Sequence, residues 1–237
     1  MNIVIIGATS GIGKALFEKY AREDNRIGTI GRRTHLLDEL YQKYPSQTVS
    51  AKADITIIEE IEKAICTLLE ALGKIDLAIL CAGTGEINTE LDYAVERPTI
   101  DTNVVGWTFV INMFYHIFEQ QDYGHLVAIT SAGGLRGEPM SPAYSATKAY
   151  QINYMEALRK MAFKNGGHIV VTDIRPGLVD TAMAKGEGLF WVMHVEKVAS
   201  QIVSAIHRKK SIAYVTKRWH ILAIINKCLP YCLYKRI

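Results

Sequence analysis

Short runs of β-branched and other apolar residues recur along the chain between glycine-containing or polar segments, a pattern typical of strands. The runs predict seven strands: Ile3–Ile6, Ile27–Ile30, Thr48–Ala51, Leu77–Leu80, Leu126–Thr130, Ile169–Asp173 and Ile212–Val215.

Longer segments between these runs carry apolar residues three and four positions apart, which is the spacing of one helix face. They predict six helices: Lys14–Ala21, His35–Tyr44, Ile58–Leu72, Thr99–Gln120, Ala143–Phe163 and Val195–His207. Strands that alternate with helices indicate stacked βαβ units. The sequence therefore predicts an α/β fold: a doubly wound, Rossmann-type parallel sheet of about seven strands with helices on both faces, followed by a C-terminal helix.

Composition places the chain among ordinary globular proteins. Of its 237 residues 49% are apolar and 22% charged, with 18 Gly and 6 Pro, which excludes collagen-like and disordered classes. No repeat or linker interrupts the pattern, so we expect one domain over residues 1–237, with 217–237 as a basic, apolar helical extension. The chain starts on a strand pattern and lacks an apolar stretch of about eighteen residues, so we expect a cytoplasmic protein without a membrane-spanning helix.

Charge is distributed unevenly under a net charge of +3. Residues 197–237 hold nine Lys or Arg and no acid, whereas residues 1–196 hold eighteen bases and twenty-four acids. No zinc-finger, basic-zipper or RNA-binding motif accompanies the basic end, so nucleic acid is not an expected partner. The four cysteines are expected to be reduced thiols, and no metal site is expected, because Cys228 and Cys232 lack a second pair of ligands.

A glycine-rich turn joins the first predicted strand to the first helix, with the sequence Gly7-Ala8-Thr9-Ser10-Gly11-Ile12-Gly13. Glycines permit a tight turn and the close approach of a pyrophosphate, and the helix N-terminus offers unpaired N–H groups. Three glycines at this spacing arise by chance in about a tenth of such chains, so their place between strand and helix carries the inference. The turn predicts a dinucleotide site, in which Thr9, Ser10 and Ile12 also lie.

The second predicted strand ends in Gly31-Arg32-Arg33, where proteins that bind NAD carry an acid for the ribose 2′-hydroxyl. An acid would repel a 2′-phosphate, whereas guanidinium groups bind phosphate through charge-assisted hydrogen bonds. Arg32 and Arg33 therefore favour NADP(H) over NAD(H). The alternative is that both arginines are simply solvated.

Tyr144 and Lys148 stand one helical turn apart on one face of a predicted helix. A tyrosine near its ordinary pKa of about 10 is a poor base at pH 7, and a nearby cation favours its phenolate. The same spacing recurs at Tyr231 and Lys235. Only the first pair follows a residue such as Ser131 at the carboxyl end of a predicted strand, where α/β sheets bind ligands, so we interpret the second pair as a chance match.

Taken together, these motifs resemble the short-chain dehydrogenase/reductase family, of the single-domain NAD(P)-dependent type, over roughly residues 1–210. The matching pieces are Gly7-xxx-Gly11-x-Gly13, Asp54, Ala82-Gly83, Asn103, Ser131, Tyr144-xxx-Lys148 and Pro176-Gly177 followed by Thr181. There are two departures. The family's usual Asn-Asn-Ala-Gly is Leu80-Cys81-Ala82-Gly83 here, and its usual Thr before the first glycine is Ile6.

The resemblance implies a role for each catalytic residue. Tyr144 would be the general acid in carbonyl reduction and the base in alcohol oxidation, and Ser131 would hydrogen-bond the substrate oxygen. Lys148 would bind the nicotinamide ribose and lower the pKa of Tyr144, and Asn103 would hold a water that links Lys148 to solvent. The further cofactor contacts would be Asp54, Ile55, Ala82, Gly83, Pro176, Gly177, Val179 and Thr181.

Apolar residues also mark the segment that covers the substrate in the resembled family: Met183, Leu189, Phe190, Trp191 and Met193. They favour a lipophilic substrate, although they could equally pack the loop onto the protein. After the last strand a helix is predicted from Lys217 to about Leu229, before Pro230. Its apolar residues cover more than half of its circumference, so it needs a cover, which could be the domain itself, a second subunit or a membrane interface.

The resulting hypothesis is an NADP(H)-dependent oxidoreductase that interconverts a carbonyl and a secondary alcohol by hydride transfer. An epimerase acting on sugars is disfavoured, since such enzymes resemble a different glycine spacing and a longer substrate domain. The alternative outside enzymes is a non-catalytic, NADP(H)-sensing protein of the same fold, for which Ser131 would have no chemical use. The resemblance also implies a homodimer or homotetramer built on the helices at Thr99–Gln120 and around Tyr144.

Overall fold

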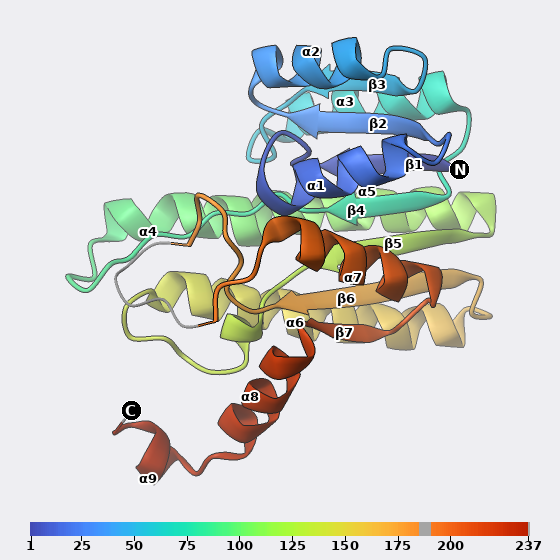
Figure 1. Cartoon of the computed structure of the whole chain (residues 1–237). Coiled ribbons are helices and arrows are strands. Elements are labelled where there is room, and N and C mark those ends of the chain that lie inside the picture. The colour runs from blue at the N-terminus through green and yellow to red at the C-terminus, as the bar shows by residue number, and fades with distance from the viewer. Residues whose placement is uncertain (185–190, 237) are drawn as a thin grey trace.

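One parallel sheet of seven strands, in the order β3-β2-β1-β4-β5-β6-β7, runs through the computed structural model, which describes residues 1–184 and 191–236 (Figure 1). The strands are β1 (Asn2–Ile6), β2 (Arg26–Gly31), β3 (Thr48–Lys52), β4 (Leu77–Leu80), β5 (Gly124–Ile129), β6 (Ile169–Pro176) and β7 (Ile212–Val215). All seven predicted runs are strands of this sheet. The predicted doubly wound α/β fold is therefore confirmed.

The helices are α1 (Gly11–Ala21), α2 (Thr34–Lys43), α3 (Ile58–Leu72), α4 (Tyr93–Ile100), α5 (Trp107–Gln121), α6 (Pro142–Lys164), α7 (Val195–His207), α8 (Lys217–Cys228) and α9 (Tyr231–Tyr234). The single helix predicted over Thr99–Gln120 is wrong in one respect. The helical segment starts at Tyr93, contains Pro98, and passes through a π-helical turn at Asp101–Gly106 before α5 begins.

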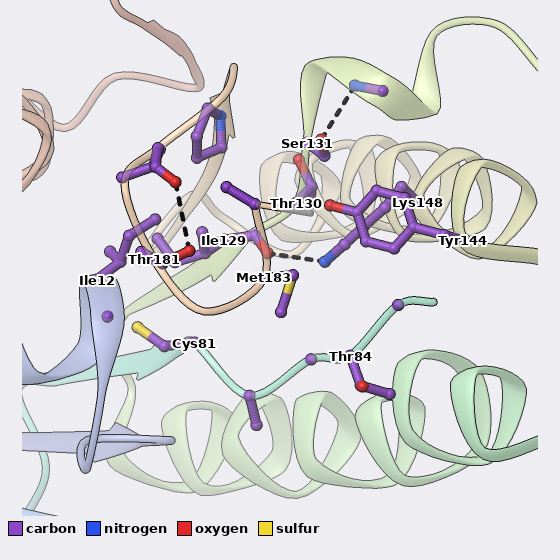
Figure 2. Close-up of a pocket in the computed structure, with 18 of the residues that line it drawn as sticks. Ile12, Cys81, Thr84, Ile129, Thr130, Ser131, Tyr144, Lys148, Thr181 and Met183 are labelled. Atoms are coloured by element: carbon purple, nitrogen blue, oxygen red, sulfur yellow. Dashed lines mark hydrogen bonds between the residues drawn. The ribbon is translucent and has the colours of Figure 1, made fainter. Parts of the chain in front are cut away.

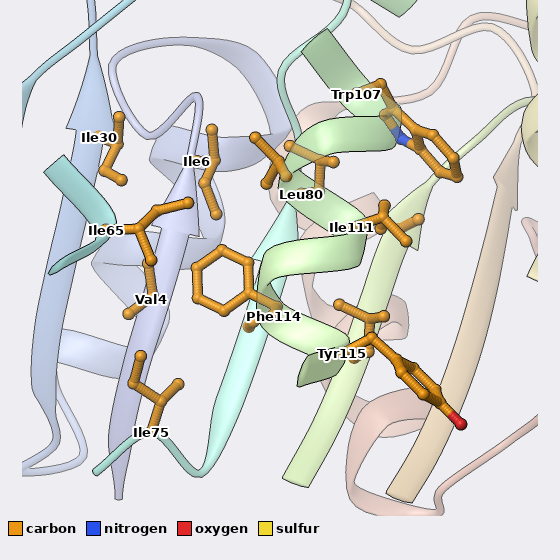
Figure 3. Close-up of a cluster of buried hydrophobic side chains, with 14 of the residues drawn as sticks. Val4, Ile6, Ile30, Ile65, Ile75, Leu80, Trp107, Ile111, Phe114 and Tyr115 are labelled. Carbon is orange, nitrogen blue, oxygen red and sulfur yellow. The ribbon is translucent and has the colours of Figure 1, made fainter. Parts of the chain in front are cut away.

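Two apolar clusters cover the two faces of the sheet. On one face α3, α5 and α6 pack on the strands, and Figure 3 shows Ile65 of α3 and Phe114 of α5 over the strands that carry Val4 and Leu80. On the other face α1, α2 and α7 pack on the sheet through residues such as Leu16. Burial on both sides explains why the strands are continuous apolar runs in the sequence.

The strand order changes direction at β1, because β2 and β3 lie on one side of it and β4 to β7 on the other. Connections therefore leave the carboxyl ends of β1 and β4 towards opposite faces of the sheet. In open α/β sheets this switch point opens the crevice in which ligands bind. Here the glycine-rich turn follows β1 and the segment Cys81–Gly85 follows β4.

The chain ends in α8 and α9, which extend away from the sheet beyond β7 (Figure 1). As predicted, α8 ends near Leu229, and Pro230 follows it and directly precedes α9. Within residues 1–184 and 191–236, no helix is long and apolar enough to cross a membrane.

Candidate active site

A cavity of about 920 Å³ opens at the carboxyl ends of the strands. It brings together most of the residues predicted for the site: Gly7, Thr9, Ser10, Gly11, Ile12, Gly13, Arg32, Arg33, Ile55, Ala82, Gly83, Ser131, Tyr144, Lys148, Pro176, Gly177, Val179 and Thr181. Two predicted residues, Asp54 and Asn103, do not line it, but each is hydrogen-bonded to a residue that does, Arg32 and Thr84 respectively.

The glycine-rich turn leaves its backbone open to a ligand. Gly7 and Gly11 have φ of +86° and +50°, values that side chains rarely permit. A Cβ on Gly13 would lie 2.1 Å from the carbonyl oxygen of Gly7, so α1 can pack against the turn only without a side chain there. Because the N-terminus of α1 faces this cavity with no side-chain cap from Ser10, the turn fits the phosphates of a dinucleotide.

Two arginines at the end of β2 border the same turn. The Arg33 guanidinium donates hydrogen bonds to Thr9 Oγ1 and Ser10 Oγ, each at 2.7 Å. The Arg32 guanidinium lies 3.4 Å from Asp54 Oδ2, and this charge helps to lower the pKa of Asp54 against the opposing effect of burial. Positive charge therefore collects beside the phosphate-binding turn, where a ribose 2′-substituent would lie.

Ser131 and Tyr144 face each other in the cavity, as Figure 2 shows. Ser131 follows β5, and its Oγ accepts a hydrogen bond from the N–H of Gly133 at 3.0 Å. Tyr144 stands in the first turns of α6, and its ring occupies space that a Cβ on Gly85 would fill. Burial raises the pKa of Tyr144, and the hydrogen bond with Ser131 acts in the opposite direction. The phenol is thus protonated at neutral pH.

Lys148 is buried and hydrogen-bonded on two sides. Its Nζ donates to the carbonyl of Ile129 at 3.3 Å and to Gln151 Oε1 at 2.9 Å. Burial lowers the pKa of Lys148 to about 8, while the negative charge of Asp173 opposes this shift. The expected lowering of the pKa of Tyr144 by Lys148 is therefore not the dominant effect, because burial disfavours the charged forms of both groups.

Asn103 is fully buried in the π-helical turn, a distortion that recurs at functional sites. Its side chain exchanges two hydrogen bonds with the backbone of Thr84, at 2.7 and 2.9 Å, and donates a third to Thr147 on α6. The backbone carbonyl oxygen of Asn103 accepts a hydrogen bond from Gln151 Nε2 at 2.9 Å. Gln151 thus bridges Asn103 and Lys148 directly. That Asn103 holds a water linking Lys148 to solvent, as the resemblance implies, stays a prediction.

A buried ion pair lies behind this site on β6. Asp173 Oδ2 is 2.7 Å from the Arg175 guanidinium, and Asp173 Oδ1 accepts a hydrogen bond from Thr130 Oγ1 at 2.6 Å. Arg175 in turn donates to Tyr214 Oη on β7. The pair therefore ties together the ends of three strands next to Ser131.

Cys81 occupies the position after β4 where the resembled family has asparagine. Burial raises the pKa of its thiol to about 12. Since the thiolate is the reactive form of cysteine, Cys81 contributes a neutral, unreactive group to the cavity wall.

The apolar side of the cavity differs from the prediction. Met183 lines it, but Met193 packs into the core, where its backbone pairs with Leu178 and Asp180. The sequence could not show this pairing because it joins two segments of irregular structure. Trp191 is 40% exposed, and the Arg218 guanidinium stacks on its ring. Leu189 and Phe190 lie outside the described residues.

The C-terminal helices supply a further part of the cavity wall. Trp219, Leu222, Ala223, Asn226 and Tyr234 line the cavity. The indole of Trp219 fills the space beside Gly177, where a Cβ would lie 2.0 Å from the ring. The sequence identified this tail as a helix in need of a cover but gave no sign that it reaches the site.

Arg136 fixes the tail against the segment that follows Ser131. Its guanidinium donates to the carbonyl oxygens of Asn226, Lys227 and Leu229 at the end of α8 and stacks on the ring of Tyr234. Tyr234 Oη donates to the carbonyl of Gly137 at 2.6 Å. The second Tyr-Lys pair is absent from the cavity lining, as expected, since Tyr231 is exposed.

Sequence reasoning missed Gln151, Gly85, Arg136 and the lining residues of the tail. Only Gln151 carried a signal, because it lies three residues after Lys148 on the same helix face and interrupts an apolar pattern with a polar side chain. The others depend on contacts between segments that are distant in the sequence.

Comparison with known proteins gives consistent matches. The family model described as short chain dehydrogenase matches residues 1–189. An uncharacterized oxidoreductase of Mycobacterium tuberculosis is 31% identical over 224 residues, which cover 90% of this chain and 87% of the relative.

Solved structures match the fold over nearly the whole chain. A short chain dehydrogenase from Burkholderia cenocepacia in complex with NADP has a TM-score of 0.85 at 19% identity, and the match covers 99% of this chain and 96% of that one. A short chain dehydrogenase/reductase from Burkholderia phymatum in complex with NAD has a TM-score of 0.84 at 19% identity, with coverage of 95% and 92%. At these identities the likeness shows the fold.

Proposed function

We propose, starting from the fact that the chain belongs to the short-chain dehydrogenase family, that it is an NADP(H)-dependent oxidoreductase that interconverts a carbonyl and a secondary alcohol. The observation that supports this most is the convergence of Ser131, Tyr144 and Lys148 on one cavity with the glycine-rich turn. The test is NADPH oxidation, followed by absorbance, with a panel of ketones and aldehydes. A non-catalytic, cofactor-sensing protein would bind NADPH without turnover.

Each side chain has a task in this reaction. A bound nicotinamide supplies or accepts the hydride. Ser131 and Tyr144 hold the carbonyl oxygen, and the phenol of Tyr144 delivers the proton in reduction and takes it back in oxidation. The raised pKa of Tyr144 keeps its proton in place at neutral pH, which is the form that reduction requires. Lys148 orients the ribose of the cofactor and places positive charge beside the phenol.

The residues proposed to bind the cofactor form two groups, one for each half of the dinucleotide. The turn from Gly7 to Gly13 would hold the pyrophosphate, and Asp54 and Ile55 would border the adenine. Ala82, Gly83, Pro176, Gly177, Val179 and Thr181 would border the nicotinamide half. Solved relatives of the same fold contain NADP in one case and NAD in another, so the preference for NADP(H) rests on Arg32 and Arg33.

Replacing Arg33 by alanine is expected to raise the Kd for NADPH by about 10- to 100-fold, because a hydrogen bond between charged groups stabilises a complex by roughly 1.5–3 kcal/mol. Arg32→Ala should act in the same direction. Fluorescence titration of each variant with NADPH and NADH measures both effects at one salt concentration. Arg22→Ala, at the C-terminal end of α1 and so far from the glycine-rich turn, serves as the control. Equal losses for NADPH and NADH would contradict the role in binding a 2′-phosphate.

A lipophilic substrate is supported by the apolar groups on the open side of the cavity. Ile87, Met140 and Met183 line it there, together with Trp219 and Leu222 of the tail. Glu86, Arg136 and Glu138 also line the cavity, and the Arg136 guanidinium is engaged by carbonyl oxygens of the tail. A longer apolar chain on the carbonyl should therefore lower KM.

Gln151 is a positioning residue, and its effect is expected to depend on pH. In Gln151→Leu the buried ammonium of Lys148 loses an acceptor, which lowers the pKa of Lys148 further and moves the high-pH limb of activity to lower pH. In Gln151→Glu the added negative charge raises the pKa of Lys148 and moves the limb to higher pH. Rates of reduction between pH 6 and pH 10 measure both shifts. Shifts in the same direction would indicate a merely structural role.

Two further proposals concern the protein as a whole. We propose a homo-oligomer built on α5 and α6, since α6 carries the exposed apolar residues Met161 and Phe163, at 41% and 83% exposure. We also propose that the chain forms one domain and works in a reducing compartment such as the cytoplasm, since its four cysteines are free thiols. Light scattering of the purified protein tests the first proposal.

A further inference from the structure

Helix α8 has apolar residues on two opposite faces. Its inner face carries Trp219, Leu222 and Ala223, which line the cavity. Its outer face carries Ile221, Ile224 and Ile225, which are 63%, 52% and 56% exposed. Burying the inner face explains only half of the apolar pattern of this helix, so the outer face requires its own explanation.

Helix α9 adds two more exposed apolar residues to the tail. Tyr231 is 71% exposed and Leu233 50% exposed. We call these two residues, together with Ile221, Ile224 and Ile225, the outer stripe. Single exposed apolar residues are normal on a protein surface, but five of them on two consecutive short helices form a patch of the kind that marks an interaction site.

Basic residues border the outer stripe on both sides. At about 100° per residue, Arg218 follows one edge of the isoleucines, and His220 and Lys227 follow the other. All three are exposed. Lys235 and Arg236 come two and three residues after Leu233, and the sequence holds no acid beyond Glu196.

The tail is held in a fixed orientation that leaves the outer stripe outward. Arg136 and Tyr234 bind the end of α8 to the segment after β5, and Trp219 packs beside Gly177. All these contacts use the inner side of the tail. The outer stripe is therefore presented on a rigid support that projects from the sheet, as Figure 1 shows for α8 and α9.

The charge of the tail decides between partners for this surface. A symmetric contact between the tails of two copies would bury the isoleucines but would bring the basic residues of both copies together. An acidic protein surface would match the charge but would leave the isoleucines without an apolar partner. An anionic bilayer satisfies both, because apolar side chains enter the acyl boundary while Lys and Arg reach the lipid phosphates.

We propose that the outer stripe of α8 and α9 docks this protein on the surface of an anionic lipid bilayer. This goes beyond the proposed reaction and does not depend on it. Since the inner face of α8 is a wall of the cavity, docking would place the cavity about one helix diameter, roughly 10 Å, from the lipid.

The test is co-sedimentation of the full chain with vesicles of phosphatidylcholine alone and of phosphatidylcholine with 30% phosphatidylglycerol, and it requires no turnover. The wild-type protein should bind the anionic vesicles, and added salt should weaken the binding. Ile221→Gln with Ile225→Gln should lower the partition coefficient by about ten-fold or more, since glutamine keeps the helix but not the apolar surface. Arg218→Gln with Lys227→Gln should lower it by about five-fold for each charge.

Matched controls separate the surface from general effects of substitution. Tyr41→Asn removes an exposed apolar residue on α2, and Lys63→Gln with Lys74→Gln removes two charges on and after α3. Both should bind like the wild type. Absence of wild-type binding to anionic vesicles, or equal binding by the isoleucine variant and its control, would overturn the proposal. So would a dimer in light scattering that the isoleucine variant dissociates. Vesicle binding without any carbonyl reduction would instead overturn the proposed reaction alone.

Discussion

Replacing Tyr144 by phenylalanine is expected to lower kcat for carbonyl reduction by about 10²- to 10⁴-fold, the usual contribution of a positioned general acid. Phenylalanine keeps the ring beside Gly85 but removes the hydroxyl that meets Ser131. The Kd for NADPH should stay within about two-fold of the wild type, because the ring still shields the cavity. Steady-state rates and fluorescence titration on one preparation measure both quantities.

Tyr150→Phe is the matched control for this experiment. It removes a hydroxyl from the same helix, where Tyr150 Oη shares a hydrogen bond with Thr108 outside the cavity. Its kcat should be close to that of the wild type. Full activity of Tyr144→Phe would refute the mechanism, and a wild-type protein that binds NADPH but reduces no carbonyl would favour the cofactor-sensing alternative.

Replacing Asp173 by alanine should have the largest effect on stability. The carboxylate is fully buried, and without it the Arg175 guanidinium keeps its charge in the interior without its directly bonded counter-ion. Removing one partner of a buried pair lowers the free energy of unfolding by about 3–5 kcal/mol. For a chain of this size the expected fall in Tm is on the order of 10 °C. Thermal unfolding followed by circular dichroism measures it.

The exposed pair Glu156–Lys160 supplies the contrast, since both side chains are more than half exposed. Glu156→Ala should leave Tm within experimental error of the wild type, because solvent screens such pairs. The double variant Asp173→Leu with Arg175→Met should recover part of the lost stability, because it leaves no buried charge. A Tm of Asp173→Ala equal to that of Glu156→Ala would contradict the structural role of the buried pair.

Loss of Asp173 should also change the pKa of Lys148 in the active site. Its negative charge raises the pKa of Lys148 against the effect of burial, so Asp173→Ala should lower the pKa of Lys148 below about 8. Lys148 would then be less charged at neutral pH. At an assay temperature well below the Tm of the variant, the high-pH limb of its activity should lie at lower pH than that of the wild type.

Local patterns in the sequence determined the strands, most helices and the part of the site that follows single strands. The glycine-rich turn after β1, the arginines after β2 and Ser131 after β5 are fixed by the order of elements, because parallel strands bring their carboxyl ends to one edge. Tyr144 and Lys148 could be paired from helical periodicity, and the place of Ser131 before them separated this pair from Tyr231 and Lys235. These features depend on neighbours a few residues apart, which a sequence displays directly.

The tertiary structure alone decided what depends on distant segments. Gln151 bridges Lys148 and Asn103 only because a π-helical turn brings Asn103 against α6, and the single helix predicted there could not anticipate this turn. Helix α8 lines the cavity beside Met183, since Arg136 binds backbone carbonyls that carry no sequence signature. The pKa of Tyr144 likewise rose with burial, which depends on packing from every side rather than on the adjacent lysine.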